Sequence, residues 1–325
     1  MRLLLIAALL LTGCSRYADF TLPVLPGGNA AAPKLNQQFA PVLQRGAPAE
    51  FDSVDALNPS VLERDGTLLN FYSGYDGKTW RTGLATSSDG EQWRKQGMVL
   101  QPDQPWEGTY IAANGSAVAR GGRLFYWYQT GVHDHPEIAL ATGSDGRHWT
   151  KQRVLPHGPY MSWDESAVGD PYVIAIGDWF YLYYLGEDRA RQQRIGLARS
   201  QDGVHWQKSR ANPLLSLPRP TPQGHMDQNG QGEPAVWEND GWHWMLFTGR
   251  DRAEHRRLAL ARSRDGVHWE QLPGVFDGAQ PWNAAVLCDP TVWMTPRGPR
   301  LLFGGGDVPS PAENIHGMIG AGWLQ

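Results

Sequence analysis

Five acid or amide side chains recur along the chain at nearly constant spacing. In each copy Pro or Gly follows the acid or amide, and a Val comes three or four residues after it. The steps between neighbouring copies are 56, 56, 63 and 56 residues. Carboxylates that are brought together act as general acids, bases or nucleophiles, so this set is the first candidate for hydrolytic chemistry. The five residues are Asn58, Asn114, Asp170, Glu233 and Asp289.

The five motifs belong to a longer repeat. An aromatic stretch follows each motif, and then a further apolar stretch that in four copies ends in an Asp-Gly turn before a Trp. Gly tolerates positive φ, so each copy predicts a strand, a tight turn and a Trp that opens the next strand. We expect the turn carboxylates to be structural and the turn Trp residues to pack between repeats. The four turn residues are Asp89, Asp145, Asp202 and Asp265.

Each copy of the repeat predicts four strands, but the fifth copy ends before its fourth strand. A counterpart lies near the N-terminus, where residues 40–44 (APVLQ) match residues 97–101 (GMVLQ). An N-terminal strand that completes the last sheet closes a ring, which an open solenoid does not explain. The sequence therefore predicts an all-β, five-bladed β-propeller with four-stranded antiparallel blades, forming a single domain over residues 38–325 and closed by the N-terminal strand.

The first strand of each propeller blade lines the central channel, so the five motif residues should converge at one mouth. Three carboxylates that face one axis repel each other, and this repulsion raises the pKa of at least one of them. The result is a protonated acid beside ionised partners at neutral pH, which is the arrangement that acid–base hydrolysis requires.

The whole repeat region, about residues 40–325, resembles the five-bladed propeller glycoside hydrolases of family 43 and its relatives of families 32, 68, 117 and 130. The resemblance is carried by Asp170–Val173 (DPYV), Glu233–Val236 (EPAV), Tyr72-Ser73-Gly74 and the Asp-Gly turns. It implies hydrolysis of a glycosidic bond by paired carboxylates, whose separation decides between inversion and retention.

The chain departs from this family pattern at one position. The first blade of family 43 supplies an Asp base, whereas this chain has Asn58, which cannot act as a base. Either the carboxylates have moved round the axis, or Asp55 supplies the base, or the protein is not catalytic. We predict Glu233 as the general acid, with one of Asp170 and Asp289 as base or nucleophile and the other orienting and tuning the site.

Other residues are candidates for substrate binding. We expect Asn58 and Asn114 to hydrogen-bond sugar hydroxyls. Trp106 and Trp163 lie on loops before the motifs and either stack on sugar faces or plug the core. Arg250 at a hairpin tip is either solvated or in reach of an anionic substrate.

The sequence predicts at most one bound metal ion and no cofactor. Related propellers sometimes hold an axial Ca²⁺ ion, and His316, which enters the last inner region, is a weak candidate beside such an ion. We expect no other metal and no cofactor.

The N-terminus predicts export. Arg2 and a short apolar run precede Leu11-Thr12-Gly13-Cys14, which resembles the bacterial lipobox. Residues 1–14 are therefore predicted as a lipoprotein signal peptide with lipidation at Cys14, and residues 15–37 as a flexible tether. We expect a protein anchored in the bacterial cell envelope, in the outer membrane and facing the periplasm, with the lipid as its sole membrane contact.

Composition excludes several other functions. A net charge of −4 and the lack of a basic stripe argue against nucleic acid as a partner. The chain contains no P-loop, no dinucleotide fingerprint and no Gly-x-Ser-x-Gly elbow, so no nucleotide is expected. The prediction is a glycosidase acting on a carbohydrate at the envelope; the alternative is a non-catalytic propeller that binds a glycan or a protein at the same mouth.

Overall fold

The computed structural model describes residues 16–28, 31–217 and 225–325. This part of the chain forms strands β1 to β21 and one short 3₁₀ helix, η1 (Pro281–Asn283). Within these ranges, no helix has both the length and the apolar character that a membrane crossing requires.

Antiparallel pairing places strands β2 to β21 in five groups of four. The first group is β3 (Asp55–Arg64), β4 (Thr67–Tyr75), β5 (Trp80–Ser87) and β6 (Arg94–Leu100). The second is β7 (Ile111–Arg120), β8 (Arg123–Val132), β9 (His135–Gly143) and β10 (Thr150–Leu155). The third is β11 (Ala167–Ile176), β12 (Trp179–Glu187), β13 (Gln193–Ser200) and β14 (Gln207–Ser209). The fourth is β15 (Gly230–Asn239), β16 (Trp242–Arg250), β17 (Arg256–Ser263) and β18 (Trp269–Phe276). The fifth is β19 (Val286–Thr295), β20 (Gly298–Gly306), β21 (Met318–Leu324) and β2 (Leu35–Gln37).

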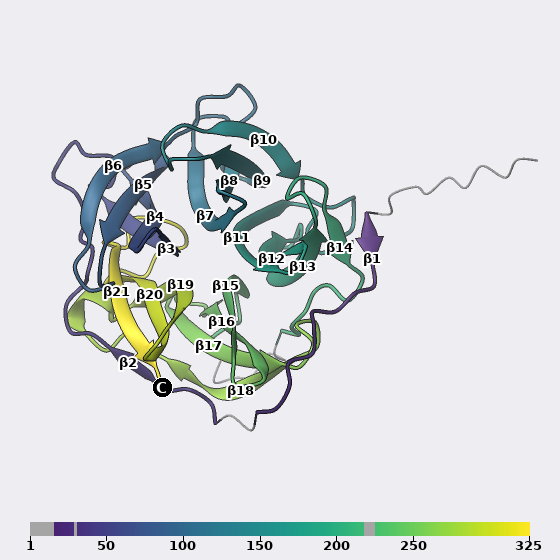
Figure 1. Cartoon of the computed structure of the whole chain (residues 1–325). Coiled ribbons are helices and arrows are strands. Elements are labelled where there is room, and N and C mark those ends of the chain that lie inside the picture. The colour runs from purple at the N-terminus through teal and green to yellow at the C-terminus, as the bar shows by residue number, and fades with distance from the viewer. Residues whose placement is uncertain (1–15, 29–30, 218–224) are drawn as a thin grey trace, which may run out of the picture.

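The groups surround a common centre, and the first strand of each group is the innermost (Figure 1). Each first strand contacts the first strands of its two neighbours, and β19 of the fifth group contacts β3 of the first. Short parallel contacts between β5 and β7, β13 and β15, and β17 and β19 link adjacent groups. The innermost strands therefore carry the motif residues to the axis.

A strand near the N-terminus completes the fifth group, and this strand lies a few residues earlier in the sequence than the predicted closing strand. Strand β2 pairs antiparallel with β21. The predicted closing strand, residues 40–44, contributes only an isolated bridge between Leu43 and Ile319.

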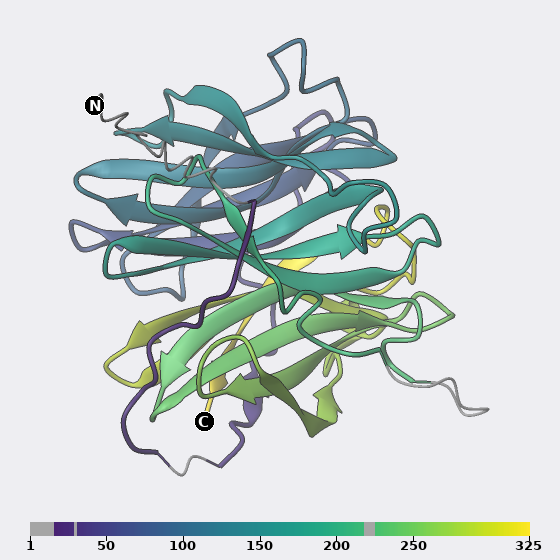
Figure 2. The same cartoon turned by 90° about the vertical axis from the view of Figure 1, so that its right-hand side faces the viewer.

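The described part of the predicted tether is not free, which corrects that prediction. Strand β1 (Tyr17–Ala18) pairs in parallel with β14. Leu22 is 1% exposed, and its N–H donates to the carbonyl of Asp265 at 2.8 Å. Figure 2 shows this N-terminal segment running along the outer edges of the strand groups. The apolar side chains Phe20 and Leu22 bury against the third and fourth groups, and this burial holds the segment in place. Residues 1–15, including the signal peptide and Cys14, lie outside the described residues.

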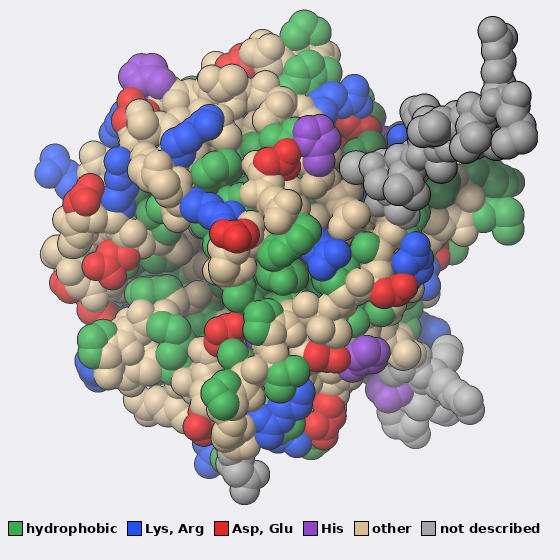
Figure 3. All heavy atoms as spheres, turned by 45° about the vertical axis from the view of Figure 1, so that its right-hand side comes forward, with side chains coloured by type: hydrophobic (Ala, Val, Ile, Leu, Met, Phe, Trp, Pro, Cys, Tyr) green, Lys and Arg blue, Asp and Glu red, His purple; other side chains and the backbone are tan. Residues whose placement is uncertain are grey.

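The Asp-Gly turns are structural, as expected. In the third group, Asp202 Oδ1 accepts the N–H groups of Val204 and His205 at 2.9 and 2.8 Å. The turn Trp206 donates to the carbonyl of Gly203 at 3.1 Å, and Trp127 of the second group meets it edge-on at 5.9 Å. These Trp residues therefore join neighbouring groups. Acidic and basic side chains are interspersed on the face of the molecule shown in Figure 3.

Candidate active site

A β-bulge interrupts each innermost strand at its motif. The pairing register shifts there in all five strands, between Leu57 and Ser60 in β3 and at the equivalent place in the others. A bulge re-aims a side chain, and non-Gly residues with positive φ gather at functional sites. The first bulge residue has a positive φ in every case: Asn58 (46°), Asn114 (50°), Asp170 (44°), Glu233 (51°) and Asp289 (50°).

The bulges bring all five motif residues together. The side-chain amide of Asn58 donates to Asp289 Oδ1 at 2.7 Å, and that of Asn114 donates to Asp170 Oδ1 at 3.2 Å. The backbone N–H of Asp289 donates to Glu233 Oε2 at 3.2 Å. The five residues line a constriction of about 30 Å³ on the axis. The three carboxyl groups are thus held by two side-chain amides and one backbone amide.

A cavity of about 150 Å³ opens above this constriction. The five motif residues line it, and so does Arg250. The other polar or aromatic residues on its wall are Trp80, Tyr110, Gln129, Gln193, Arg256 and Glu313.

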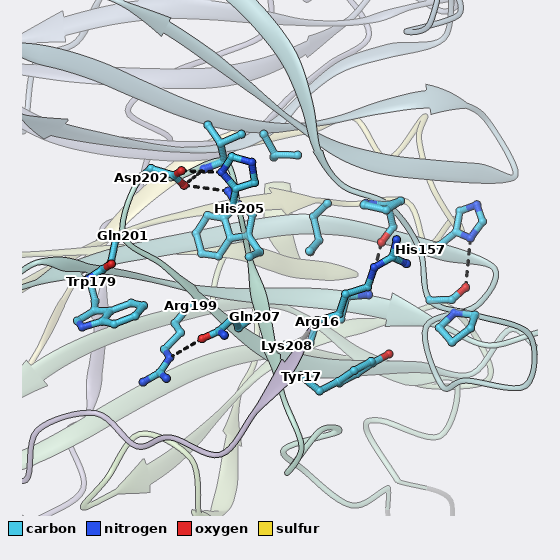
Figure 4. Close-up of a pocket in the computed structure, with 17 residues that line it drawn as sticks. Arg16, Tyr17, His157, Trp179, Arg199, Gln201, Asp202, His205, Gln207 and Lys208 are labelled. Carbon is cyan, nitrogen blue, oxygen red and sulfur yellow. Dashed lines mark hydrogen bonds and ion pairs between the residues drawn. The ribbon is translucent and has the colours of Figure 1, made fainter. Parts of the chain in front are cut away.

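A larger hollow of about 680 Å³ lies on the outside of the third group, beneath β1 (Figure 4). Trp179, Arg199 and Lys208 line it together with Asp202, whose carboxylate is tied into its own turn. None of the axial carboxylates reaches this hollow, so the acid–base chemistry belongs to the smaller, central cavity.

Burial, and then neighbouring negative charge, raise the pKa of Asp170 and of Asp289. Burial raises the pKa of Asp170 to about 7, with the negative charge of Glu233 adding to the effect and the Asn114 hydrogen bond opposing it. Burial, and then the charges of Glu233 and Asp170, raise the pKa of Asp289 well above its usual range. The raised pKa of each group favours its protonated form at pH values where an ordinary aspartate is ionised.

A buried cation lies beside the axial carboxyl groups. Arg256 is 5% exposed; burial lowers its pKa, but the interactions with Glu233, Cys288 and Asp289 together outweigh burial and the net pKa is raised. The guanidinium of Arg256 therefore lies within electrostatic reach of both Glu233 and Asp289. These electrostatics favour Asp170 as proton donor, whereas the sequence-based assignment gave that role to Glu233.

Asp55 is wrongly predicted as a base or substrate contact. It is fully buried and accepts the backbone N–H groups of Asn314 and Gly317, both at 2.7 Å. A carboxylate saturated in this way holds a loop in place and does not face the cavity.

Trp106 and Trp163 are also absent from the cavity wall, which corrects the prediction that they stack on sugar. Trp163 packs on Tyr184 with ring centroids 5.6 Å apart, in space that Gly186 and Gly196 leave open. Trp106 packs into the apolar core of the first and second groups. The glycines explain the outcome, because a Cβ at either position would collide with the Trp163 ring.

Arg250 lines the cavity, where it pairs with Glu254 at 2.7 Å and donates to Gln193 at 2.9 Å, and its contact with an anionic substrate stays a prediction. His316 lies against Asp307 at 2.8 Å and does not line the cavity. Among the described residues, the group with metal-ligand spacing is Glu233, Cys288 and Asp289, whose ligand atoms lie within 4.8 Å of one another. The guanidinium of Arg256 acts on the same group, and its charge disfavours a cation there. The expectation of an axial Ca²⁺ ion stays a prediction.

Sequence reasoning missed several cavity residues. Trp80, Gln193 and Arg256 are the first residues of the third strands β5, β13 and β17, so they occupy equivalent repeat positions. The repeat itself was the signal that would have found them. Glu313 and Tyr110 lie in loops outside the repeated strands, where no such signal exists.

Comparison with known proteins places this site in context. A family model described as the glycosyl hydrolases family 32 N-terminal domain matches residues 68–218. An uncharacterized protein of Mycobacterium tuberculosis is 26% identical over 225 residues, which cover 64% of this chain and 72% of that protein. A probable sucrose-6-phosphate hydrolase of Psychromonas ingrahamii is 30% identical over 181 residues, covering 52% of this chain but only 32% of that protein.

Solved structures share the fold over nearly the whole chain. A family 130 glycoside hydrolase that targets β-1,2 mannosidic linkages in Candida mannan has a TM-score of 0.66 at 17% identity, covering 94% of this chain and 96% of that one. A thermostable family 43 glycoside hydrolase has a TM-score of 0.63 at 14% identity, covering 85% and 92%. At these identities the structures show a common fold.

Proposed function

Because the chain belongs to the superfamily of glycoside hydrolase propellers, we propose that its axial carboxyl groups hydrolyse a glycosidic bond of a carbohydrate bound in the central cavity. The family-model match and the sucrose-6-phosphate hydrolase relative confirm the prediction of a glycosidase. The five strand groups are the five blades of a closed ring in this proposal; the contact of β19 with β3 and the pairing of β2 with β21 support it.

One observation carries the proposed chemistry: Asp170, with a pKa raised to about 7 by burial and then by the charge of Glu233, lies in the same cavity as Glu233 itself. Asp170 donates its proton to the departing glycosidic oxygen, because a general acid works best when its pKa is near the working pH. The charge of Glu233 stabilises the positive charge that develops on the sugar ring. Asp289, fixed by Asn58, orients Glu233 through its backbone N–H.

The size of the cavity supports action on a chain end. Its volume of about 150 Å³ is well below the roughly 300–1,000 Å³ of pockets for drug-sized ligands. The five motif residues line both this cavity and the constriction of about 30 Å³. The cavity therefore holds a single terminal sugar residue, whose hydroxyl groups meet the amides of Asn58, Asn114, Gln129 and Gln193.

The proposed location rests on the N-terminal sequence. The lipobox-like Leu11-Thr12-Gly13-Cys14 supports a lipid anchor in the bacterial cell envelope. In this proposal the enzyme trims exported or scavenged oligosaccharides at the outer membrane, facing the periplasm.

The test is turnover of a panel of α- and β-linked furanosides and pyranosides by the protein without residues 1–14. The panel contains each sugar both as a 4-nitrophenyl glycoside and as a disaccharide with a poor leaving group. Asp170→Asn should lose 10²–10⁴-fold on the disaccharide and much less on the 4-nitrophenyl glycoside, since a good leaving group needs no proton. Asp240→Asn, at an exposed turn with φ of 50°, is the control.

Two outcomes oppose the proposal. An Asp170→Asn variant that loses equal activity on both kinds of substrate contradicts the role of proton donor. Wild-type protein that binds a glycan of the panel without turning any over favours the alternative, a non-catalytic binding propeller.

A further inference from the structure

The axial ring lacks a second carboxylate for the attacking water. Glu233 and Asp289 are crowded together, with carboxyl oxygens within 4.8 Å, and burial raises the pKa of both Asp170 and Asp289. Asn58 has no proton-accepting carboxylate. Hydrolysis with inversion needs a base on the face of the sugar opposite the proton donor, with room for a water molecule between them.

We propose that Glu313 is this general base. The proposal rests on the hydrolytic function proposed above. Glu313 lines the central cavity from residues 307–317, the loop between β20 and β21. Figure 1 shows this loop, in yellow, reaching towards the centre beside β3 and β4. The hydrogen bonds of Asp55, on β3, to Asn314 and Gly317 place this loop beside the first strand group.

Tyr110 orients the Glu313 carboxylate. Its hydroxyl donates to Glu313 Oε2 at 3.0 Å, and Tyr110 lines the same cavity. Burial, and then the negative charge of Glu313, raise the pKa of the Tyr110 hydroxyl, so Tyr110 remains a donor at any working pH. A carboxylate with one oxygen held in place has the preorganisation that a base requires.

The loop that carries Glu313 is clamped from two sides. Asp55 accepts the N–H groups of Asn314 and Gly317, both at 2.7 Å. Arg256 donates to the carbonyl groups of Ser310 and Pro311 at 3.0 and 2.9 Å. Asp55 is thus a positioning residue for Glu313, and Arg256 connects the loop to the charge of Glu233.

The reaction balances with one water molecule. The water oxygen forms a bond to the anomeric carbon while the bond from that carbon to the leaving oxygen breaks. Glu313 takes one proton of the water, and Asp170 gives its proton to the leaving oxygen. Proton exchange with solvent then restores both groups, and the first product has inverted anomeric configuration.

The experiment uses the glycoside that wild-type protein turns over best in the panel above. Glu313→Gln should lower kcat by 10²–10⁴-fold and change KM only slightly, because the amide occupies the same space and accepts no proton. The acidic limb of the pH profile of kcat/KM should disappear, and the alkaline limb should remain. Glu63→Gln, an exposed position on β3, is the matched control and should leave kcat unchanged.

Azide separates a catalytic role from a structural one. Glu313→Ala should regain activity with azide and release a glycosyl azide of inverted configuration, whereas a loop that has merely lost its shape is not rescued. If kcat is unchanged in Glu313→Gln, Glu313 is not the general base. Turnover by the wild-type protein would still support the proposed hydrolase function. A first product of retained configuration also overturns it. Wild-type protein without turnover removes the function and this proposal together.

Discussion

The side-chain amide of Asn58 and the carboxyl group of Asp289 share a hydrogen bond of 2.7 Å that joins the first and fifth strand groups. Asp289 is 6% exposed, and burial raises its pKa well above the usual range. An Asp at position 58 would place a second carboxylate at this distance. The amide of Asn58 thus gives Asp289 a hydrogen-bond donor at a position where an Asp would add a second carboxylate.

Asn58→Asp should destabilise the protein increasingly as pH rises. At low pH both carboxyl groups are protonated and share a hydrogen bond. As pH rises, both ionise in the unfolded chain but resist ionisation in the folded one, so stability falls. We expect a loss of about 1–3 kcal/mol at pH 8 and less at pH 5, measured by urea unfolding. Asn36→Asp, on exposed backbone of β2, should show no such dependence. Equal losses at both values of pH would contradict the expected charge repulsion.

Asp170 should make wild-type stability fall between about pH 4 and pH 7. Burial and the charge of Glu233 raise its folded-state pKa from 3.8 to about 7, so the folded protein binds more protons than the unfolded chain in this window. The stabilising contribution is complete below the unfolded value and is lost as pH rises through the folded value, at up to roughly 1.4 kcal/mol per pH unit. The difference in unfolding free energy between wild type and Asp170→Asn, followed against pH, measures it. A flat difference would place the pKa of Asp170 near its ordinary value.

Asp55→Asn should loosen the loop that carries Glu313. The amide can accept only one of the two backbone N–H groups, from Asn314 or Gly317, and leaves the other unpaired. A buried unpaired donor costs about 1–3 kcal/mol. Hydrogen exchange should become faster at Asn314 and Gly317, and kcat should fall more than KM changes. Asp65→Asn, at an exposed turn, is the control. If the amides of Asn314 and Gly317 exchange as slowly in Asp55→Asn as in wild type, Asp55 does not hold the loop in place.

Leu22→Ala should reveal that the N-terminal segment belongs to the folded body. Leu22 is 1% exposed and packs against the third and fourth groups, so its truncation should cost about 2–4 kcal/mol. Val24 lies two residues further on and is 69% exposed, so Val24→Ala should change stability by less than about 0.5 kcal/mol. Thermal or urea unfolding compares the two. Equally small effects of the two substitutions on stability would support the predicted flexible tether instead.

The sequence by itself determined the repeated architecture. Strand alternation, Asp-Gly turns and the acid or amide before Pro or Gly are local features, and each copy reports the same hydrogen-bonding pattern. Five copies at a common period predicted five strand groups, and equivalence within the repeat predicted that Asn58, Asn114, Asp170, Glu233 and Asp289 lie together. The bulges and positive φ at all five positions follow the same local rule.

Only the tertiary structure decided what these residues face. Trp163 stacks in the core and not on the cavity because Gly186 and Gly196 are brought beside it from other strands. Asp55 meets a loop more than 250 residues away, and the same loop carries Glu313 into the site. The proton on Asp170 depends on burial and on the distance to Glu233. A repeat describes equivalent local conformations; burial and the distance between charges arise from segments far apart in the chain, so they appear only once the chain is folded.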